Sequence, residues 1–435
     1  MKKQRIESWG GLAVDVPDPM VPAQYLSQPV LPGSALPFGN GRSYGDTCLN
    51  AEGNVITSRA ESRVLSFDPS TGLLEAEAGV LLSEVIALSA PQGWFPPVVP
   101  GTQFVTLGGA IANDIHGKNH HRKGTFGRHV TEIHLERSGE GRLILKPDDQ
   151  TGLFAATVGG LGLTGLIRKA VLQLMPVGSS SIRQVTTRFD NLETYFDLVH
   201  AADQEHEYAV AWIDSLSTGK YFGRGHLIAG DHVGGDVGTE VAAAQLFRVP
   251  FTPPISPLQG PFLSIFNETY FRGSPPGVSA KTVPSGKFFF PLDRIGRWNR
   301  LYGPRGLHQH QSVIPEKGAF EIVKSLLECT QKHRHGSFLT VLKRFGDVAS
   351  PGFMSFPRAG YTLTLDFPDK GLKTLHLLQR LDEITLSAGG GINPYKDRRM
   401  SPETFKTSFP QWKLLEEMRD PALLSDFWRR TVLSN

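Results

Sequence analysis

Cysteine is scarce in this chain of 435 residues, which contains only Cys48 and Cys329. Two cysteines cannot form a disulfide framework or a metal site built from cysteine ligands, so a reducing compartment fits the composition best. Net charge is also small, because 45 basic residues face 42 acidic ones and leave a formal charge of +3. That balance does not indicate a nucleic-acid partner.

Long apolar runs are missing as well. The least polar long stretch, residues 153–167, is interrupted by four glycines and is shorter than the ~20 residues that a membrane-spanning helix needs. The basic start MKKQRIESWGG has no apolar segment behind it, so we expect no signal peptide. The sequence therefore predicts a protein that is cytoplasmic or peripheral at the cell membrane.

Glycine, by contrast, is plentiful, and its first concentration lies in residues 36–50, where Gly39, Gly41 and Gly45 surround Arg42. Glycine lets the backbone adopt positive φ and approach a ligand, and successive N–H groups of such a turn can point at one anion. The stretch is not a Walker A loop, which needs Gly-Lys-Ser/Thr, and it lacks the spacing and the helix of a Rossmann fingerprint. An ordinary turn is the alternative.

A second glycine-rich stretch, residues 100–121, continues from Gly108-Gly109 through small residues into a polar run, DIHGKNHH. Small residues suit close packing against a flat ligand. His116 and His120 are four residues apart, as in a zinc-binding helix, but Gly117 lies between them and the glutamate of His-Glu-x-x-His is missing. We expect no metal; a polar loop with hydrogen-bonded histidines is the structural alternative.

The third stretch, residues 157–167, contains four glycines. Three such stretches within the first 170 residues suit an elongated cofactor that contains a pyrophosphate. Close packing at the corner of a barrel is the alternative explanation of the third stretch.

Hydrophobic periodicity predicts a mixture of helices and strands. Before residue 177 we expect mainly short strands with turns, including a hairpin about residues 69–72 and one helix over 81–88 that Ser83 could cap. Further strands are predicted at 130–135, 142–145, 169–175, 208–214, 220–228, 338–345 and 361–367, and helices at 192–202, 320–332, 372–388, 401–408 and from 412 onward.

Residues 249–291 are unusual, since they combine many prolines and glycines with many aromatic side chains. The segment is too apolar for a solvated linker and too interrupted for one regular element. We interpret it as a long loop, either packed on its own domain or serving as a mobile lid or an apolar contact surface.

Three motifs carry a family resemblance: GRSYGD at 41–46, the run from PGT to DIHGKNHH at 100–121, and the glycine-rich block at 156–165. They resemble the vanillyl-alcohol-oxidase-type (PCMH-type) FAD-dependent oxidoreductases. Further stretches are similar, in the same order, to a branch of this family that oxidises lipid-linked sugars, at residues 298–304, 309–315, 343–346, 366–368 and 395–397.

The resemblance implies an α+β fold. A two-subdomain FAD-binding domain would consist of residues 1–177 and of a C-terminal return, residues 386–435. A substrate domain with an antiparallel sheet would occupy residues 178–385 and include the long apolar loop at about 249–291.

The resemblance also implies FAD, bound without a covalent bond in preference to a covalent link through His116. The residues that would contact it are Gly39, Asn40, Gly41, Arg42, Ser43, Tyr44, Gly45, Asp46, Gly101, Thr102, Thr106, Leu107, Gly108, Gly109, Asn113, Asp114, Ile115, His116, Gly162, Ile167 and Asn393.

The implied reaction is oxidation of a secondary alcohol, of the ribose 2′-OH type, on a polyprenyl-phosphate-linked sugar. It would form the oxidative half of an epimerisation shared with a short-chain reductase, in the supply of an arabinan precursor for cell wall biosynthesis, and the lipid implies a peripheral membrane contact. Lys396, Lys118 and Tyr302 would be catalytic. The substrate pocket would contain Gln309, Gln311, Lys343, Thr362 and Thr364.

The chain departs from the family's mycobacterial pattern at two positions of this pocket. Thr364 stands where those members have a cysteine, and Thr362 stands where they have an asparagine. Two other functions stay open: a soluble sugar-alcohol or aldonolactone oxidase that makes hydrogen peroxide, and a non-catalytic flavin-binding protein of a cell-envelope complex.

Overall fold

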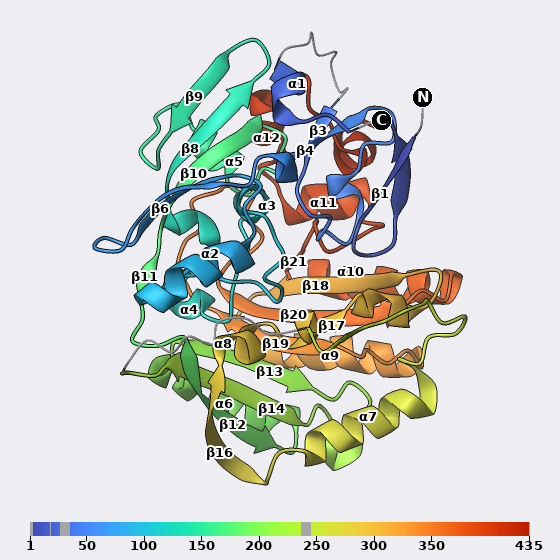
Figure 1. Ribbon diagram of the computed structural model, residues 1–435. Helices are drawn as coiled ribbons and strands as arrows, with labels where there is room; N and C mark the ends of the chain where they lie inside the picture. Colours follow the sequence, from blue (N-terminus) through green and yellow to red (C-terminus); the bar gives the residue numbers. More distant parts are fainter. Residues whose placement is uncertain (1–2, 18, 27–34, 236–244, 435) are drawn as a thin grey trace.

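Two antiparallel sheets organise the protein, one in the upper and one in the lower half of Figure 1. This computed structural model describes residues 3–17, 19–26, 35–235 and 245–434; Met1 and Lys2, at the basic start of the chain, lie outside them. The upper sheet has five strands in the order β5 (Val64–Asp68), β6 (Leu73–Glu77), β10 (Leu166–Gln173), β8 (Val130–Arg137) and β9 (Gly141–Leu145). The hairpin about residues 69–72 is confirmed, because β5 and β6 pair directly across it.

The glycine-rich stretches lie beside this sheet. A parallel pair, β3 (Ala35–Phe38) and β4 (Asn54–Thr57), leads into and out of the first stretch. Helix α2 (Leu82–Ser89) is confirmed, but the prediction that Ser83 caps it is wrong. The helix begins at Leu82, so Ser83 lies inside its first turn and Leu81 is the N-cap residue. The Glu84 carboxylate accepts a hydrogen bond from the Leu81 N–H (2.7 Å).

The largest hydrophobic cluster of the upper half joins residues from its sheet to residues near the C-terminus. Leu107 and Ile111 of α3 (Leu107–Ala112) pack in the same cluster as Phe405 and Trp428 near the C-terminus. The C-terminal segment supplies short helices to this half: α11 (Pro402–Ser408), α12 (Trp412–Met418) and α13 (Asp426–Trp428).

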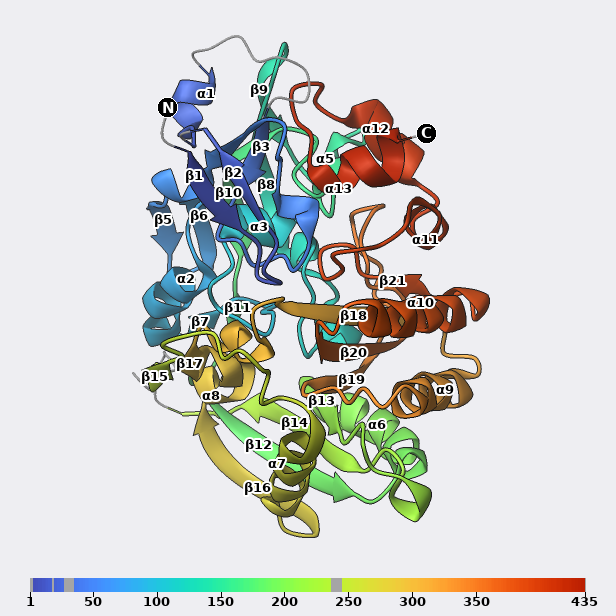
Figure 2. The same ribbon diagram turned by 90° about the vertical axis from the view of Figure 1, so that its right-hand side faces the viewer.

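The lower sheet has eight strands, and all its pairings are antiparallel. Helices α6 (Leu192–Glu205), α9 (Ala319–Lys332) and α10 (Leu372–Ser387) lie together on one of its faces (Figure 2). The order is β16 (Gly277–Pro284), β12 (Ser181–Phe189), β14 (Gly225–His232), β13 (Tyr208–Ile213), β19 (Thr340–Phe345), β20 (Gly360–Pro368), β18 (Leu307–Ile314) and β21 (Gly391–Ile392).

Several strands of this sheet differ from the prediction, and no strand was predicted at β12 or β21. Residues 219–221 form a 3₁₀ turn, so β14 begins only at Gly225 and the strand predicted from residue 220 is too long. Strand β18 was not predicted at all, because its start, LHQHQ, has no apolar alternation. It is nevertheless buried along its whole length, since α10 covers one side and polar partners meet the other.

The prediction of one long loop over 249–291 is wrong for its larger part. Helix α7 (Gly260–Arg272) begins with Pro261 in its first turn, where proline costs no hydrogen bond. Strand β16 and helix α8 (Ser285–Phe289) follow it. Residues 250–259 remain irregular, between α7 and the short strand β15 (Phe247–Arg248).

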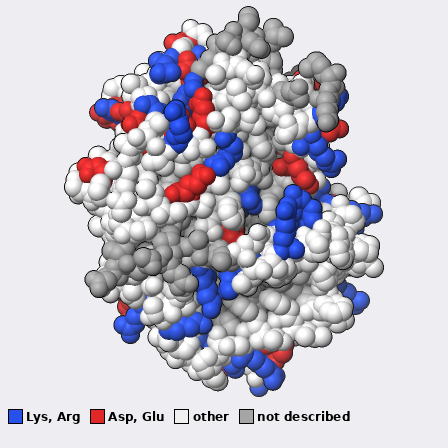
Figure 3. Space-filling model, in the orientation of Figure 1, with Lys and Arg blue, Asp and Glu red and all other residues white. Residues whose placement is uncertain are grey.

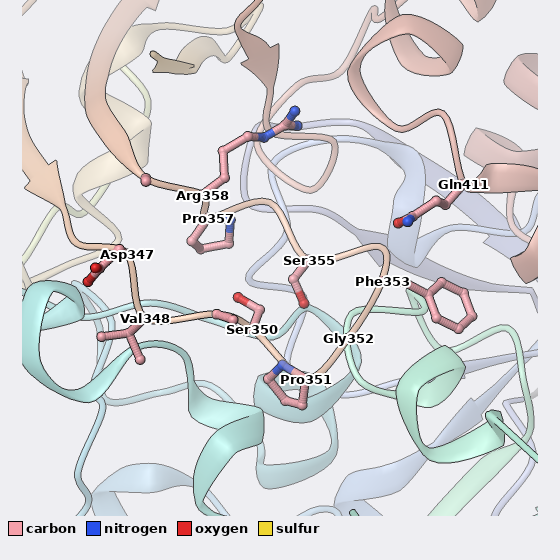
Figure 4. A pocket seen from close by; sticks show the side chains of 12 residues that line it. Asp347, Val348, Ser350, Pro351, Gly352, Phe353, Ser355, Pro357, Arg358 and Gln411 are labelled. Atoms are coloured by element: carbon pink, nitrogen blue, oxygen red, sulfur yellow. The ribbon is translucent and has the colours of Figure 1, made fainter. Parts of the chain in front are cut away.

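A loop of the lower sheet ties the two halves together. Residues 347–359 connect β19 to β20, and Ser355 donates a hydrogen bond to Asp114 of the upper half (2.5 Å). Arg358 donates to the Ser408 carbonyl (2.7 Å). The loop surrounds a hollow of about 410 Å³, with Gln411 opposite (Figure 4). None of the predicted site residues lines this hollow.

Candidate active site

A larger cavity, of about 870 Å³, is lined by all three glycine-rich stretches and by the face of the lower sheet that the three helices leave free. Strand β18 shows how the sheet supplies it. His310 points to Asp382 of α10 (3.2 Å), whereas its neighbours Gln309 and Gln311 line the cavity. The period of two in a strand therefore separates structural from cavity-lining side chains.

Most residues predicted to contact FAD line this cavity. They are Gly39, Asn40, Gly41, Arg42, Ser43, Tyr44, Gly101, Thr102, Thr106, Gly108, Gly109, Asn113, Ile115, His116, Gly162 and Ile167. The predicted residues Lys118, Lys396, Gln309, Gln311, Lys343 and Thr364 line it too. Positions scattered over 360 residues of sequence thus meet at one space.

Two residues of the first stretch face away from the cavity. A Cβ on Gly45 would meet the carbonyl oxygen of Asp397, so this glycine allows close packing of the C-terminal segment. Asp46 forms an ion pair with Arg430 (Nε–Oδ2 2.6 Å). Both residues therefore contact the C-terminal segment and do not line the cavity.

Three further predicted cofactor contacts are also displaced from the lining. Leu107 is buried in the upper core. Asp114 accepts hydrogen bonds from the Gly127 N–H (2.8 Å) and from Ser355, and burial raises its pKa to about 6. Asn393 donates to the Gln311 side-chain oxygen (2.9 Å), so it fixes the orientation of a lining residue.

The lining suits the pyrophosphate of a dinucleotide. Gly41 has a φ of +58°, and a Cβ on Gly101 or Gly162 would meet no atom within 4 Å, so these backbones border open space. Within the described part of the chain, Arg42 Nε and Thr47 Oγ1 are among the buried side-chain atoms without a hydrogen-bond partner, and both residues line the cavity. A cation and a hydroxyl that lack protein partners fit an anionic ligand.

Three half-buried lysines converge on the same space. Burial lowers the pKa of Lys118 and of Lys343 to about 7. Burial likewise lowers the pKa of Lys396 to about 8, an effect that the Asp366 carboxylate opposes, and its Nζ lies 4.4 Å from the Tyr44 ring centroid. Buried amines that titrate near neutral pH are candidates for proton transfer.

His116 is held by residues from two strands of the lower sheet. Its Nε2 lies 3.0 Å from Gln311 Nε2, and its Nδ1 lies 3.2 Å from Lys343 Nζ. Burial, reinforced by the Lys343 charge, keeps the pKa of His116 well below its usual value, so the imidazole is neutral at pH 7. Both ring nitrogens already have protein partners.

Tyr302 and Thr362 form a layer behind the lining. The Tyr302 hydroxyl lies 3.4 Å from Asp366 Oδ2, and Gln309 Nε2 donates to Oδ1 of the same carboxylate (2.5 Å). The Thr362 hydroxyl accepts from Gln311 Nε2 (3.2 Å). Neither Tyr302 nor Thr362 reaches the cavity itself, contrary to the prediction that they contact substrate.

Asp366 and helix α8 were missed by sequence reasoning. Asp366 is fully buried, and burial raises its pKa to about 7. In the sequence, only its place in the family-like stretch 366–368 indicated a role. Lys118 Nζ donates to the carbonyls of Phe288 (2.6 Å) and Phe289 (3.2 Å), which no local pattern connects to residue 118.

Within the described ranges, no three side chains of His, Cys, Asp or Glu come close enough to hold a metal ion. None of the helices seen there has the length and apolar character needed to cross a membrane.

The comparisons with known proteins agree with this site. Residues 33–145 match a family model described as "FAD binding domain". Decaprenylphosphoryl-β-D-ribose oxidase from Mycolicibacterium smegmatis is 34% identical over 458 aligned residues, which cover 99% of this chain and 98% of that protein. The chain belongs to this oxidase family. It is an FAD-dependent oxidoreductase, and its antiparallel sheets and interspersed helices confirm the predicted α+β class.

Two further proteins are similar to this chain. An uncharacterized protein from the mprA 5′ region of Streptomyces coelicolor is 32% identical over 81% of this chain and all of its own length. Probable L-gulonolactone oxidase 6 from Arabidopsis thaliana is 27% identical, but over only 38% of this chain and 28% of its own.

Proposed function

We propose that this enzyme oxidises the 2′-hydroxyl of a ribose that is linked to a polyprenyl phosphate. The observation that carries the proposal is the cavity that three half-buried lysines line together with the three glycine-rich stretches. Full-length similarity to an oxidase named for such a substrate supports it.

Backbone and side chains of the upper half would hold the cofactor. Gly39, Gly41 and Gly101 expose backbone to the cavity, and Arg42 would neutralise pyrophosphate charge. FAD, when bound, supplies the hydride acceptor. We propose non-covalent attachment, because both ring nitrogens of His116 are engaged by Gln311 and Lys343.

The residues of the chain would manage the proton. Lys396 lines the cavity and its lowered pKa of about 8 lets it exchange a proton near neutral pH, so we assign it to the proton of the substrate hydroxyl. Lys118 and Lys343 would stabilise negative charge that develops on the substrate oxygen. Tyr302 is a positioning residue, since it acts through Asp366.

Thr364 would set the polarity of the pocket. It lines the cavity and lies opposite Gln311 in the β18–β20 pair, where its hydroxyl offers a hydrogen bond that a thiol would make only weakly. The threonine cannot form a thiol adduct, so an electrophilic inhibitor that requires a cysteine here should fail.

The keto product would pass to a short-chain reductase, and the pair of enzymes would invert one carbon of an arabinan precursor for the cell wall. A polyprenyl substrate resides in a lipid layer, so the enzyme would act at the cytoplasmic surface of a membrane. The lactone oxidase alternative has only the partial similarity above in its favour, and no feature of the cavity favours a non-catalytic protein.

The test is the flavin spectrum under anaerobic conditions. We expect a yellow protein whose flavin is released by acid and is bleached by polyprenyl-phosphoryl ribose. Bleaching by a free polyol or an aldonolactone, with fast reoxidation in air, would instead support the soluble oxidase. A flavin that none of these sugars reduces would overturn the enzyme assignment, and flavin that precipitates with the chain would show a covalent bond.

A further inference from the structure

We infer that helix α7 and residues 246–255 form a membrane-docking face, which binds an anionic lipid bilayer at the entrance of the cavity. The inference rests on the proposed function in one respect: a polyprenyl-linked substrate lies in a bilayer, which the enzyme must reach. The binding itself can be measured without any substrate.

Helix α7 has a buried side and, next to it, a broad apolar surface that is largely exposed. Leu263 and Phe271 are buried against the lower half. Outside this buried side Phe262 is 71% exposed and Ile265 is 64% exposed, and Phe266 and Tyr270, each 41% exposed, border the buried residues. A helix that buries one stripe and presents aromatic and aliphatic side chains on another has a second surface still to cover.

The segment before the helix continues this surface. Leu246, Phe247, Phe251 and Ile255 are between 55% and 74% exposed. Figure 2 shows β15 at the left edge of the molecule and α7 in its lower middle, and residues 249–259 connect the two. Exposed apolar side chains thus continue along the chain from residue 246 into α7.

The docking face is continuous with the cavity. Phe266 and Tyr270 line the cavity although they are substantially exposed, so they mark its mouth. Lys281 and Lys287 are exposed lining residues of the same mouth. A lipid tail that leaves the cavity here would run directly along the apolar stripe of α7, and its phosphate would pass the lysines.

Charge distinguishes a bilayer from an ordinary protein partner. Residues 245–306 contain eight Lys or Arg but only two acidic residues. Of these two, Glu268 is paired with Arg224 (2.6 Å) and with Arg272, and Asp293 is buried and accepts the Gln103 N–H. Blue atoms also predominate over red in the lower half of Figure 3. Exposed apolar side chains among cations that outnumber the acidic residues suit the surface of an anionic membrane.

The experiment uses flotation of the full-length holoenzyme with vesicles. We expect binding to vesicles of phosphatidylglycerol and phosphatidylcholine, weaker binding to phosphatidylcholine alone, and release by salt. The variant Phe262→Ser/Ile265→Ser changes the most exposed side chains of α7, neither of which lines the cavity. It should lower the partition coefficient between vesicles and water roughly tenfold or more, because two apolar side chains that insert into the bilayer are lost.

The matched control is Leu65→Ser/Ile144→Ser, which removes apolar side chains that are 41% and 58% exposed on the upper sheet. It should bind vesicles as the wild type does. The charge variant Arg248→Glu/Arg297→Glu should weaken binding to the anionic vesicles only.

Equal binding by the α7 variant and the wild type would overturn the inference, as would an equal loss in the control. No binding of the wild type to anionic vesicles would do so too. If the α7 variant instead changes the sedimentation of the protein without lipid, the face is an interface between copies of the chain. Failure of the ribose substrate to reduce the flavin, with vesicle binding intact, would count against the proposed function alone.

Discussion

The surroundings of Lys396 set its pKa and therefore its ability to exchange a proton. Its ammonium group is buried, it lies over the Tyr44 ring, and Asp366 is the acidic neighbour that raises its otherwise lowered pKa. Asp366 is in turn held by Gln309 and Tyr302. Proton transfer at Lys396 should therefore depend on residues behind the cavity lining, Asp366 and Tyr302.

Replacing Lys396 with methionine should lower the rate of flavin reduction by about a hundredfold or more, the scale of one lost preorganised donor. The FAD content should stay unchanged, because the glycine-rich lining lies elsewhere. Stopped-flow reduction with polyprenyl-phosphoryl ribose measures the rate, and exposed Lys317→Met is the control. A normal rate in Lys396→Met would transfer the role to Lys118 or Lys343.

Asp366→Asn should move the pH profile of flavin reduction toward acid. The Asp366 charge raises the pKa of Lys396 from the value that burial alone would give, so its removal lowers that pKa. The limb of the profile that reports Lys396 should shift while the FAD content is kept. An unshifted profile with a lower rate would mean that Asp366 only supports the local packing.

At the scale of elements, the glycine-rich turns serve two purposes that the sequence does not distinguish. Gly101 borders open space, whereas Gly45 packs against the backbone of Asp397. Both lie in motifs of the same appearance, but only one faces the cavity.

Gly101→Val and Gly45→Val should therefore fail in different ways. The valine at 101 would project into the cavity, so the protein should fold with a near-normal melting temperature but contain little FAD. The valine at 45 would push away the 397 backbone, so it should destabilise the fold by roughly 1–3 kcal/mol or more, as overpacking does. Flavin absorbance and thermal unfolding distinguish the two. Full flavin in Gly101→Val would mean that the cofactor does not pass this glycine.

At the scale of the whole molecule, the three lysines of the cavity lower the free energy of unfolding at neutral pH. Lys118, Lys343 and Lys396 have folded-state pKa values of about 7, 7 and 8, below the usual 10.5. Between these values and 10.5 the unfolded chain binds more protons than the folded one, so the free energy of unfolding rises with pH. Asp366, with its pKa raised to about 7, acts in the opposite direction, but only between about pH 4 and 7.

Urea unfolding of the flavin-free protein should therefore show stability that increases from pH 7 to pH 9. The variant Lys118→Met/Lys343→Met/Lys396→Met should lose this slope and be more stable at pH 7 by several kcal/mol, since one pKa unit corresponds to about 1.4 kcal/mol. The same slope in the variant would show that other groups cause the dependence.

The sequence by itself determined the local elements, and with the family resemblance it also indicated the cofactor. The hairpin at 69–72, helix α9 and helix α10 follow from periodicity and turn residues, and three glycine-rich stretches indicated the dinucleotide. These signals are local, since turn preference and helical period depend on neighbours a few residues apart.

Only the tertiary structure decided which residues share the cavity. Strand β18 is polar in sequence and was missed, yet pairing with β20 places Gln311 beside His116, 195 residues away. Asp46 and Asp114 belong to the right motifs but bind Arg430 and Ser355 instead of facing the cavity. The exposed apolar surface of α7 likewise became visible only when the side next to it was seen to be buried. Direction of a side chain depends on long-range packing, which no local pattern contains.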